Sequence, residues 1–287
     1  MLAVRRALAT ELRRLREHAG MSGDLVAERL GWSASKVSRI ETHRTGVKAR
    51  DLAQLLDLYG ADEATRHQLA ALAAEQDPRG WWTTFAPTFP ASYVAYIGLE
   101  DSAVTLHSWS PELIHGLLQT EDYARATMQS AFGSPPRVPP GEIQRRVEAR
   151  LRRQELFWRE SREFLFILDE AALRHRLGTA ATMHAQLTHL GRMSSLPQVT
   201  IRVLPFTAVY PIGPCGFAIL GFAPAHGAAL GDVVYVEHLT GQSFFENEAE
   251  TYEYRLAFEQ LQAGALDPGP SMQLVADVAR DAWANQE

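Results

Sequence analysis

The chain has 287 residues, enough for about two domains of ordinary size. Its hydrophobic content of 46% is that of a packed globular protein rather than a disordered one. No run approaches the roughly 20 apolar residues that span a bilayer, and the arginine-rich start lacks the apolar stretch of a secretory signal. Cys215 is the sole cysteine, which excludes an internal disulfide. The sequence therefore predicts a cytoplasmic protein with no membrane contact.

The net charge of −6 is unevenly distributed. Residues 1–60 carry 11 Lys and Arg against 7 Asp and Glu, a balance of +4, and the remainder carries −10. Only the N-terminal part thus favours a polyanionic partner, although a balance of this size decides little by itself.

The first predicted helix covers residues 3–18. Leu8, Leu12 and Leu15 recur at helical spacing and form its inward face. We expect the arginines to point outward: Arg5, Arg6, Arg13, Arg14 and Arg16.

Residues 22–42, SGDLVAERLGWSASKVSRIET, predict two short helices joined by a tight turn at Gly31, because glycine tolerates positive φ. Ser22 and Ser33 stand where helix N-caps are needed. Ala27 lies where the two helices would cross, and its small side chain permits close approach.

The second of these two helices has a polar outer face. Val37 and Ile40 are three residues apart and point inward. This leaves four side chains outside: Ser35, Lys36, Ser38 and Arg39. A short, cationic face suits a helix that reads a major groove, and the alternative is an ordinary helical hairpin with a solvated face.

Two further helices are predicted, at 49–59 and 62–75. Five helices with the hairpin at positions two and three, and the run KVSRIETHRTG (36–46), resemble the Cro-type (XRE) helix-turn-helix domain. The resemblance implies binding to double-stranded DNA, with the third helix in the major groove. One departure is that Gly23 and Asp24 stand where the family often has Gln.

The predicted DNA contacts follow from this arrangement. We expect Ser35, Lys36, Ser38 and Arg39 near base edges. We expect the phosphate contacts from the following loop and from helix N-termini: Arg44, Thr45, Lys48, and Ser22 or Ser33. One such domain buries little surface, so a homodimer on two half-sites about 34 Å apart is expected.

Residues 77–96 predict a connector between domains at 1–76 and 97–287. The segment 76–96 holds three prolines, too many for one helix. It is also aromatic, which indicates packing against one or both domains, and the alternative is an exposed interaction patch.

Residues 97–287 alternate between strand and helix patterns. Strands are predicted at 104–109, 164–169, 199–206, 217–222 and 233–239. Helices are predicted at 120–132, 142–162, 171–177, 181–194, 247–264 and 271–283. Strand, helices, strand over 164–206 predicts a parallel pair. The predicted fold class is an all-α five-helix DNA-binding domain followed by an α+β domain with a small mixed sheet.

Several strings in this second domain resemble one family: SPELIHGLLQTEDYA (110–124), RRQELFW (152–158), ILDEAALRHRLG (167–178), IRVLPF (201–206) and VVYVEHLTG (233–241). They are similar to the domain of unknown function that follows Cro-type domains in actinobacterial regulators, including WhiJ-like proteins. The resemblance implies a regulator of development or specialised metabolism and a small partner protein often encoded nearby.

Side chains that could carry chemistry have simpler structural interpretations. Asp169 and Glu170, and Glu237 and His238, end predicted strands, where active-site carboxylates often lie. A helix cap at Asp169 and an ion pair of Glu237 with an arginine explain them better. His175, His184 and His189 lack metal-ligand spacing, and a buried, inert thiol is expected at Cys215. We expect no catalytic site, no metal and no cofactor.

Pocket or interface candidates are Gln119, Thr120, Tyr123 and the arginine-rich run 145–154. The alternative for 116–120 is a loop that caps the following helix. The sequence thus predicts a DNA-binding transcriptional regulator. Its second domain would provide dimerisation and signal input from a small molecule or a small partner protein. An enzyme, or an antitoxin-like module with an autoregulatory helix-turn-helix, is the alternative.

Overall fold

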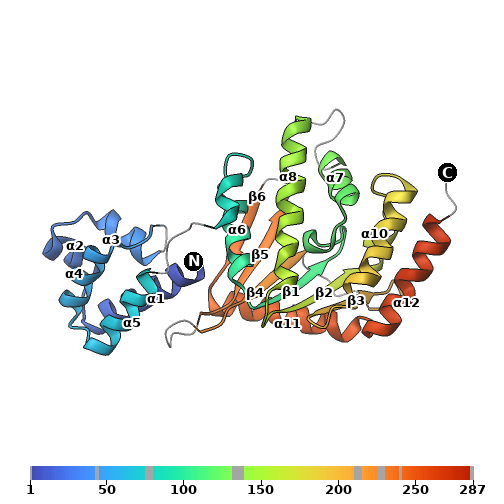
Figure 1. Cartoon of the computed structure of the whole chain (residues 1–287). Helices are drawn as coiled ribbons and strands as arrows, with labels where there is room; N and C mark the ends of the chain where they lie inside the picture. Colours follow the sequence, from blue (N-terminus) through green and yellow to red (C-terminus); the bar gives the residue numbers. More distant parts are fainter. Residues whose placement is uncertain are drawn as a thin grey trace. The chain divides into compact units, whose positions relative to one another are not determined.

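The computed structural model describes residues 2–42, 45–74, 80–130, 139–209, 215–224, 230–238 and 241–284 (Figure 1). The chain forms two compact units. Unit 1 comprises Met1–Gly80 with Phe222–Gly231, and unit 2 comprises Trp81–Gly221 with Asp232–Glu287. Among the described residues, no helix combines the length and the apolar character needed to cross a bilayer.

Unit 1 contains the five helices that the sequence predicts: α1 (Leu2–His18), α2 (Gly23–Leu30), α3 (Ala34–Glu41), α4 (Ala49–Tyr59) and α5 (Glu63–Ala74). Every one of them contributes to a single apolar core, which includes Leu8, Leu12, Val26, Val37, Ile40, Leu55, Leu69 and Leu72.

The predicted caps are present. Ser22 Oγ accepts from the Leu25 amide and Ser33 Oγ from the Lys36 amide, each at 3.2 Å. Gly31 has φ of +66°, and the next amide, of Trp32, donates to the Ala27 carbonyl at 2.8 Å. This left-handed turn fixes the angle between α2 and α3, because a residue with a Cβ adopts it only at a cost.

Two arginines of α1 do not point outward as predicted. Arg6 is only 9% exposed. Arg16 is largely covered and forms a two-pronged ion pair with Glu41 of α3, with N–O distances of 2.7 and 3.0 Å. Helical spacing alone placed them on the polar face, but neighbouring segments of unit 1 cover that flank.

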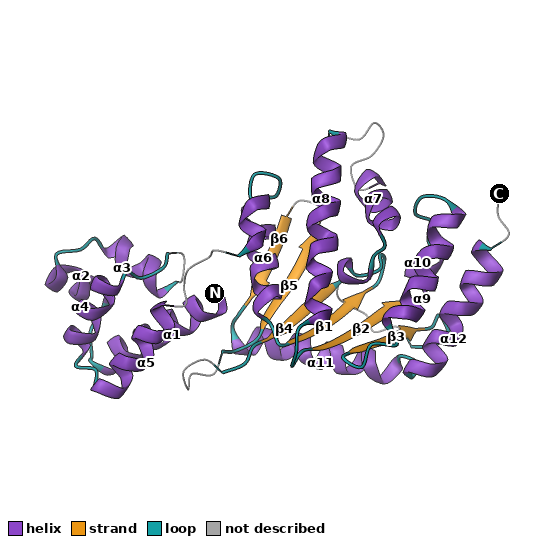
Figure 2. Ribbon diagram, viewed as in Figure 1, coloured by secondary structure: helices purple, strands orange, loops and turns teal. Residues whose placement is uncertain are grey.

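Unit 2 is built on one six-stranded mixed sheet (Figure 2). Its strands are β1 (Thr105–Ser110), β2 (Glu163–Asp169), β3 (Val199–Leu204), β4 (Phe217–Gly221), β5 (Val233–His238) and β6 (Gly241–Phe245). The order is β3-β2-β1-β4-β5-β6. The pairs β1–β2 and β2–β3 are parallel, as predicted for β2–β3, and the others are antiparallel.

Helices lie on both faces of this sheet (Figure 2). They are α6 (Ala91–Ser102), α7 (Glu121–Ser130), α8 (Pro140–Arg153), α9 (Glu170–Arg174), α10 (Ala180–Met193), α11 (Glu248–Gly264) and α12 (Pro268–Val278). Short turns lie at Trp81–Phe85, Gly116–Leu118, Gln154–Trp158 and Ala279–Trp283. On one face, Phe258 and Leu261 of α11 pack on strand residues such as Trp109 and Ile219.

Three secondary-structure predictions for this unit were wrong. The helix predicted at 142–162 ends at Arg153 and tightens into a 3₁₀ turn, which brings the Phe157 ring within 4.8 Å of Phe164. The prolines at 76–96 all precede Ala91, so α6 begins directly after Pro90. Strand β6, a short polar and aromatic run, was missed.

Candidate nucleic-acid interface

The exposed side of α3 is a stripe of four polar side chains. Ser35, Ser38, Arg39 and Thr42 are all exposed and follow the spacing i, i+3, i+4, i+7 of one helix face. Behind them Val37 and Ile40 are 2% and 5% exposed and hold the helix to the core. Thr42 belongs to this stripe and was not predicted, although its distance of seven residues from Ser35 could have indicated it.

Arg39 is the cation of this stripe. Its Nη1 lies 3.3 Å from Ser35 Oγ, which directs the guanidinium toward the start of α3. In the described part of the chain it has no carboxylate partner. Five other cations of unit 1 have one: Arg13–Glu17, Arg14–Glu11, Arg16–Glu41, Lys36–Asp51 and Arg66–Asp57. The Arg39 donors are therefore available to an external acceptor.

Lys36 is placed differently from the prediction of a base contact. Its Nζ lies 2.9 Å from Asp51 of α4 and 3.5 Å from the centre of the Trp32 ring. The side chain is about one-third exposed, at 32%. Lys36 thus joins α3 to the start of α4 rather than extending from the outer stripe.

Ser33 already serves as the α3 cap, and its hydroxyl also lies 3.2 Å from Ser35 Oγ. Thr42 donates its hydroxyl proton to the Ser38 carbonyl at 2.6 Å. The hydroxyls of Ser33, Ser35 and Thr42 are therefore ordered by contacts within this segment, and Thr42, which only donates, keeps its lone pairs for an external donor.

Exposed Thr45 and Lys48 precede α4, as predicted, and Arg44 lies outside the described residues. Lys48 is the N-cap of α4 and makes no side-chain cap bond. Arg50, the second residue of the same helix, is exposed and has no partner among the described residues, and it was not predicted. Asp51 bonds Lys36 of α3, so the start of α4, which carries both cations, is tied to the same helix as the stripe.

An open hollow of about 490 Å³ lies directly beside the stripe, because Ser35, Ser38 and Thr42 are part of its lining. It is lined by residues of three helices, including Arg13, Gly23, Asp24, Ser38 and Glu41. The charged residues of this lining are Arg13, Asp24 and Glu41, and Glu41 is already paired with Arg16 at 2.7 Å. Asp24, at the start of α2, is a carboxylate and does not favour a phosphate contact from this position.

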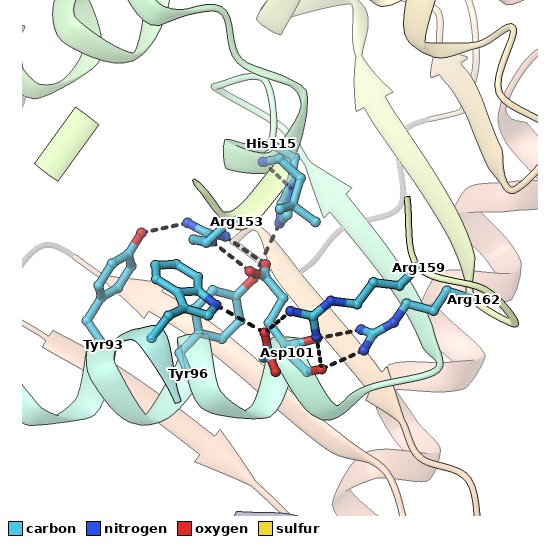
Figure 3. Close-up of polar contacts among 10 residues, drawn as sticks. Tyr93, Tyr96, Asp101, His115, Arg153, Arg159 and Arg162 are labelled. Atoms are coloured by element: carbon cyan, nitrogen blue, oxygen red, sulfur yellow. Dashed lines mark hydrogen bonds and ion pairs between the residues drawn. The ribbon is translucent and has the colours of Figure 1, made fainter. Parts of the chain in front are cut away.

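Unit 2 contains a buried charged network of a different kind (Figure 3). Arg153, 3% exposed, donates from Nε and Nη2 to both oxygens of Glu100 at 2.6 and 2.7 Å, and from Nη1 to the Tyr93 hydroxyl at 2.7 Å. The Tyr96 hydroxyl donates to Glu100 at 2.9 Å. This bidentate pair joins α8 to α6 across one face of the sheet.

His115 extends this network in its neutral form. Its Nδ1 accepts from the Leu117 amide at 3.3 Å, so the ring proton is on Nε2, 3.5 Å from the Tyr96 hydroxyl. Burial, reinforced by the nearby Arg153 and Arg150, lowers the pKa of His115 well below its usual value.

The segment 114–120, a predicted pocket candidate, is fixed by buried amides. Gln119 donates to the Ile114 carbonyl and accepts from Arg150, both at 2.7 Å. Gln186 accepts from the Thr120 amide and donates to the Leu118 carbonyl at the same distance. The Tyr123 hydroxyl accepts from the Ile114 amide. These contacts favour the interpretation of this segment as a packed cap before α7.

The end of α6 is held by two arginines and a tryptophan (Figure 3). Arg162 donates to the Asp101 carbonyl at 2.6 Å, and Arg159 pairs with the Asp101 carboxylate at 2.9 Å, which Trp81 also approaches. Cations at a helix C-terminus are favourable, so these residues have a structural role.

Two of the candidate acid–base residues, Asp169 and Glu170, have structural partners, whereas Glu237 is exposed and forms no ion pair with a described residue. Asp169 accepts from the Ala171 amide at 2.7 Å and caps α9, and Glu170 binds Arg174 at the same distance. Cys215 is exposed, contrary to the prediction of a buried thiol, because it lies in a loop before β4. No group of three metal-ligating side chains occurs in the described ranges.

Comparison with known proteins agrees with the two-part architecture. Residues 7–69 match the family model "Helix-turn-helix domain", so unit 1 is a helix-turn-helix domain, a fold that binds DNA. Residues 93–277 match "Domain of unknown function (DUF5753)", and the chain belongs to that family. Neither the curated proteins nor the solved structures include a match.

Proposed function

We propose that this protein is a sequence-specific transcriptional regulator of the XRE type, acting in the cytoplasm, whose α3 enters the major groove of duplex DNA. The observation that carries the proposal is the exposed stripe of α3. Its arginine has no acidic partner in the described chain, whereas Arg13, Arg14, Arg16, Lys36 and Arg66 of the same unit are paired. An unpaired, oriented guanidinium suits the two acceptors of a guanine edge.

Lys48 and Arg50 supply the electrostatic part of the interface. They are exposed, free of described acidic partners, and joined to α3 through Asp51. Contacts of this kind hold the protein on the phosphate backbone without selecting a sequence. In this proposal α3 contacts the bases, and the start of α4 holds the protein on the phosphate backbone.

A selection from a random duplex library tests the proposal. The full chain should enrich one motif, and Arg39→Ala should enrich none or a degenerate one. Arg14→Ala is the matched control, because Arg14 is equally cationic and exposed but paired with Glu11 at 2.5 Å. If the wild-type chain enriches no motif, sequence-specific binding is wrong.

We propose that unit 2 provides dimerisation and signal input rather than catalysis, as in WhiJ-like regulators of development or specialised metabolism. The structural engagement of Asp169 and Glu170 supports this role. The input is a small molecule or a small partner protein. A metabolite that raises the melting temperature of the chain supports the first, and a stoichiometric complex with a neighbouring gene's product supports the second. Turnover of a library compound would indicate an enzyme.

A further inference from the structure

The two edge strands of the unit 2 sheet, β3 and β6, differ in how their outward backbone groups are covered. At the β3 edge, the Val203 carbonyl accepts from the Leu266 amide and the Val203 amide donates to Ser271 Oγ, both at 2.9 Å. Arg202 also donates from Nε to the Leu266 carbonyl. The connection between α11 and α12 therefore closes this edge.

The β6 edge has no such cover in the described part of the chain. The backbone of β6 pairs with β5, and no further backbone hydrogen bond of Gly241–Phe245 is formed with a described residue. Its two faces are occupied: Phe245 packs on Tyr254 of α11 at 5.3 Å, and Ser92 of α6 donates to the Gln242 side chain. Only the outward row of amides and carbonyls is left.

The residues of β6 do not protect this edge. Exposed edges are usually shielded by lysine or another charge, by proline, or by a bulge. The β6 run GQSFF contains no charged residue and no proline, and its pairing with β5 is continuous from Gly241 to Phe245. An open, regular and neutral strand is a template for another strand.

We propose that β6 pairs antiparallel with β6 of a second copy, so that two sheets join into one across a two-fold axis. Because the described residues leave one edge of the sheet open, the association closes at two copies, whereas two open edges would allow a polymer. A neutral strand also opposes its own copy without like-charge repulsion, whichever register it adopts. The proposal rests on the proposed function in one respect: a second copy supplies the second helix-turn-helix that a two-half-site operator requires.

Five residues provide few interchain hydrogen bonds, so the two copies should associate only weakly in the absence of DNA. Binding to two adjacent half-sites would strengthen this association. Sedimentation equilibrium of the full chain over a wide concentration range tests this directly. The wild-type chain should show a monomer–dimer equilibrium. Ser243→Lys, which introduces like charges at the paired edge, should weaken it at least about ten-fold.

Two controls separate pairing from folding. Ser243→Ala removes the hydroxyl that lies 3.0 Å from His238 without adding charge, and it should remain dimeric. Thr200→Lys adds the same charge to the closed edge at β3 and should also remain dimeric. A wild-type chain that is monomeric throughout, or a folded Ser243→Lys chain that dimerises normally, would overturn the proposal.

Hydrogen exchange on the wild-type chain keeps the test independent of any variant. Alternate amides of Gly241–Phe245 should become protected as protein concentration rises, and unchanged exchange contradicts the pairing. The duplex library separates this proposal from the DNA-binding one. A folded, monomeric Ser243→Lys chain should enrich a single half-site, whereas a wild-type dimer that enriches nothing refutes DNA reading and leaves the β6 pairing intact.

Discussion

Arg39 in unit 1 and Arg153 in unit 2 are the same side chain in opposite environments. Arg39 is exposed, rests on a serine hydroxyl and has no described acidic partner. Arg153 is buried and donates hydrogen bonds to Glu100 and Tyr93. The difference shows that an exposed arginine without an acidic partner is available to a ligand, whereas a buried arginine paired with a carboxylate stabilises the fold.

The largest expected effect is the loss of stability when the buried Arg153 is replaced. Arg153→Met leaves the Glu100 carboxylate buried without its partner, which should lower the free energy of unfolding by about 3–5 kcal/mol. Urea unfolding followed by tryptophan fluorescence measures it. Arg159→Met is the control, because Arg159 is 39% exposed and its pair with Asp101 contributes about 1 kcal/mol or less. Equal losses in the two variants would contradict the distinction.

The phosphate contacts are tested by salt. Lys48→Ala and Arg50→Ala should each weaken DNA binding on all sequences and lower the slope of log K against log salt by about one unit. Fluorescence anisotropy at several salt concentrations measures this slope. A loss confined to one base pair of the operator would instead show that the residue reads a base.

Lys36 lies between these two kinds of cation. Lys36→Ala should cost unit 1 about 1 kcal/mol through the lost contacts with Asp51 and Trp32 and should leave the salt slope unchanged. Lys36→Arg should restore stability, since arginine can form both contacts. A slope lowered as in Lys48→Ala would show that Lys36 leaves Asp51 to bind a phosphate.

The smallest effect concerns pH. The folded pKa of His115 is lowered by burial, Arg153 and Arg150, so below about pH 6.5 the unfolded chain binds a proton that the folded chain does not. The free energy of unfolding therefore has its full value well above this pH and falls by about 1 kcal/mol as the pH drops from 6.5 to 5.5. Tyr96 and Glu100 face the same ring and are unchanged in His115→Asn, whose unfolding free energy should vary less with pH. An identical pH dependence in both chains would rule out His115 as the source.

The parts predictable from sequence are those fixed by neighbours in the chain. The caps at Ser22 and Ser33 and the turn at Gly31 depend on contacts within a few residues, and they were located correctly. Apolar runs also identified five of the six strands, because each is buried along most of its length.

The remaining features depend on residues far apart in the chain. Lys36 was expected on the outer face because Asp51, 15 residues later, could not be seen as its partner. Glu100 and Arg153 are 53 residues apart, so their pairing has no local sign. Strand β6 is too short and polar to show alternation, and it exists because β5 pairs with it.

The most direct test of the central claim measures how the Arg39→Ala substitution changes affinity for two DNA duplexes. Wild-type and Arg39→Ala chains are titrated against the selected duplex and against the same duplex with its bases permuted. We predict that Arg39→Ala loses about 10-fold to 100-fold in affinity for the selected duplex and almost nothing for the permuted one, with an unchanged melting temperature. Equal losses on both duplexes, or no loss on either, would contradict a base-reading α3.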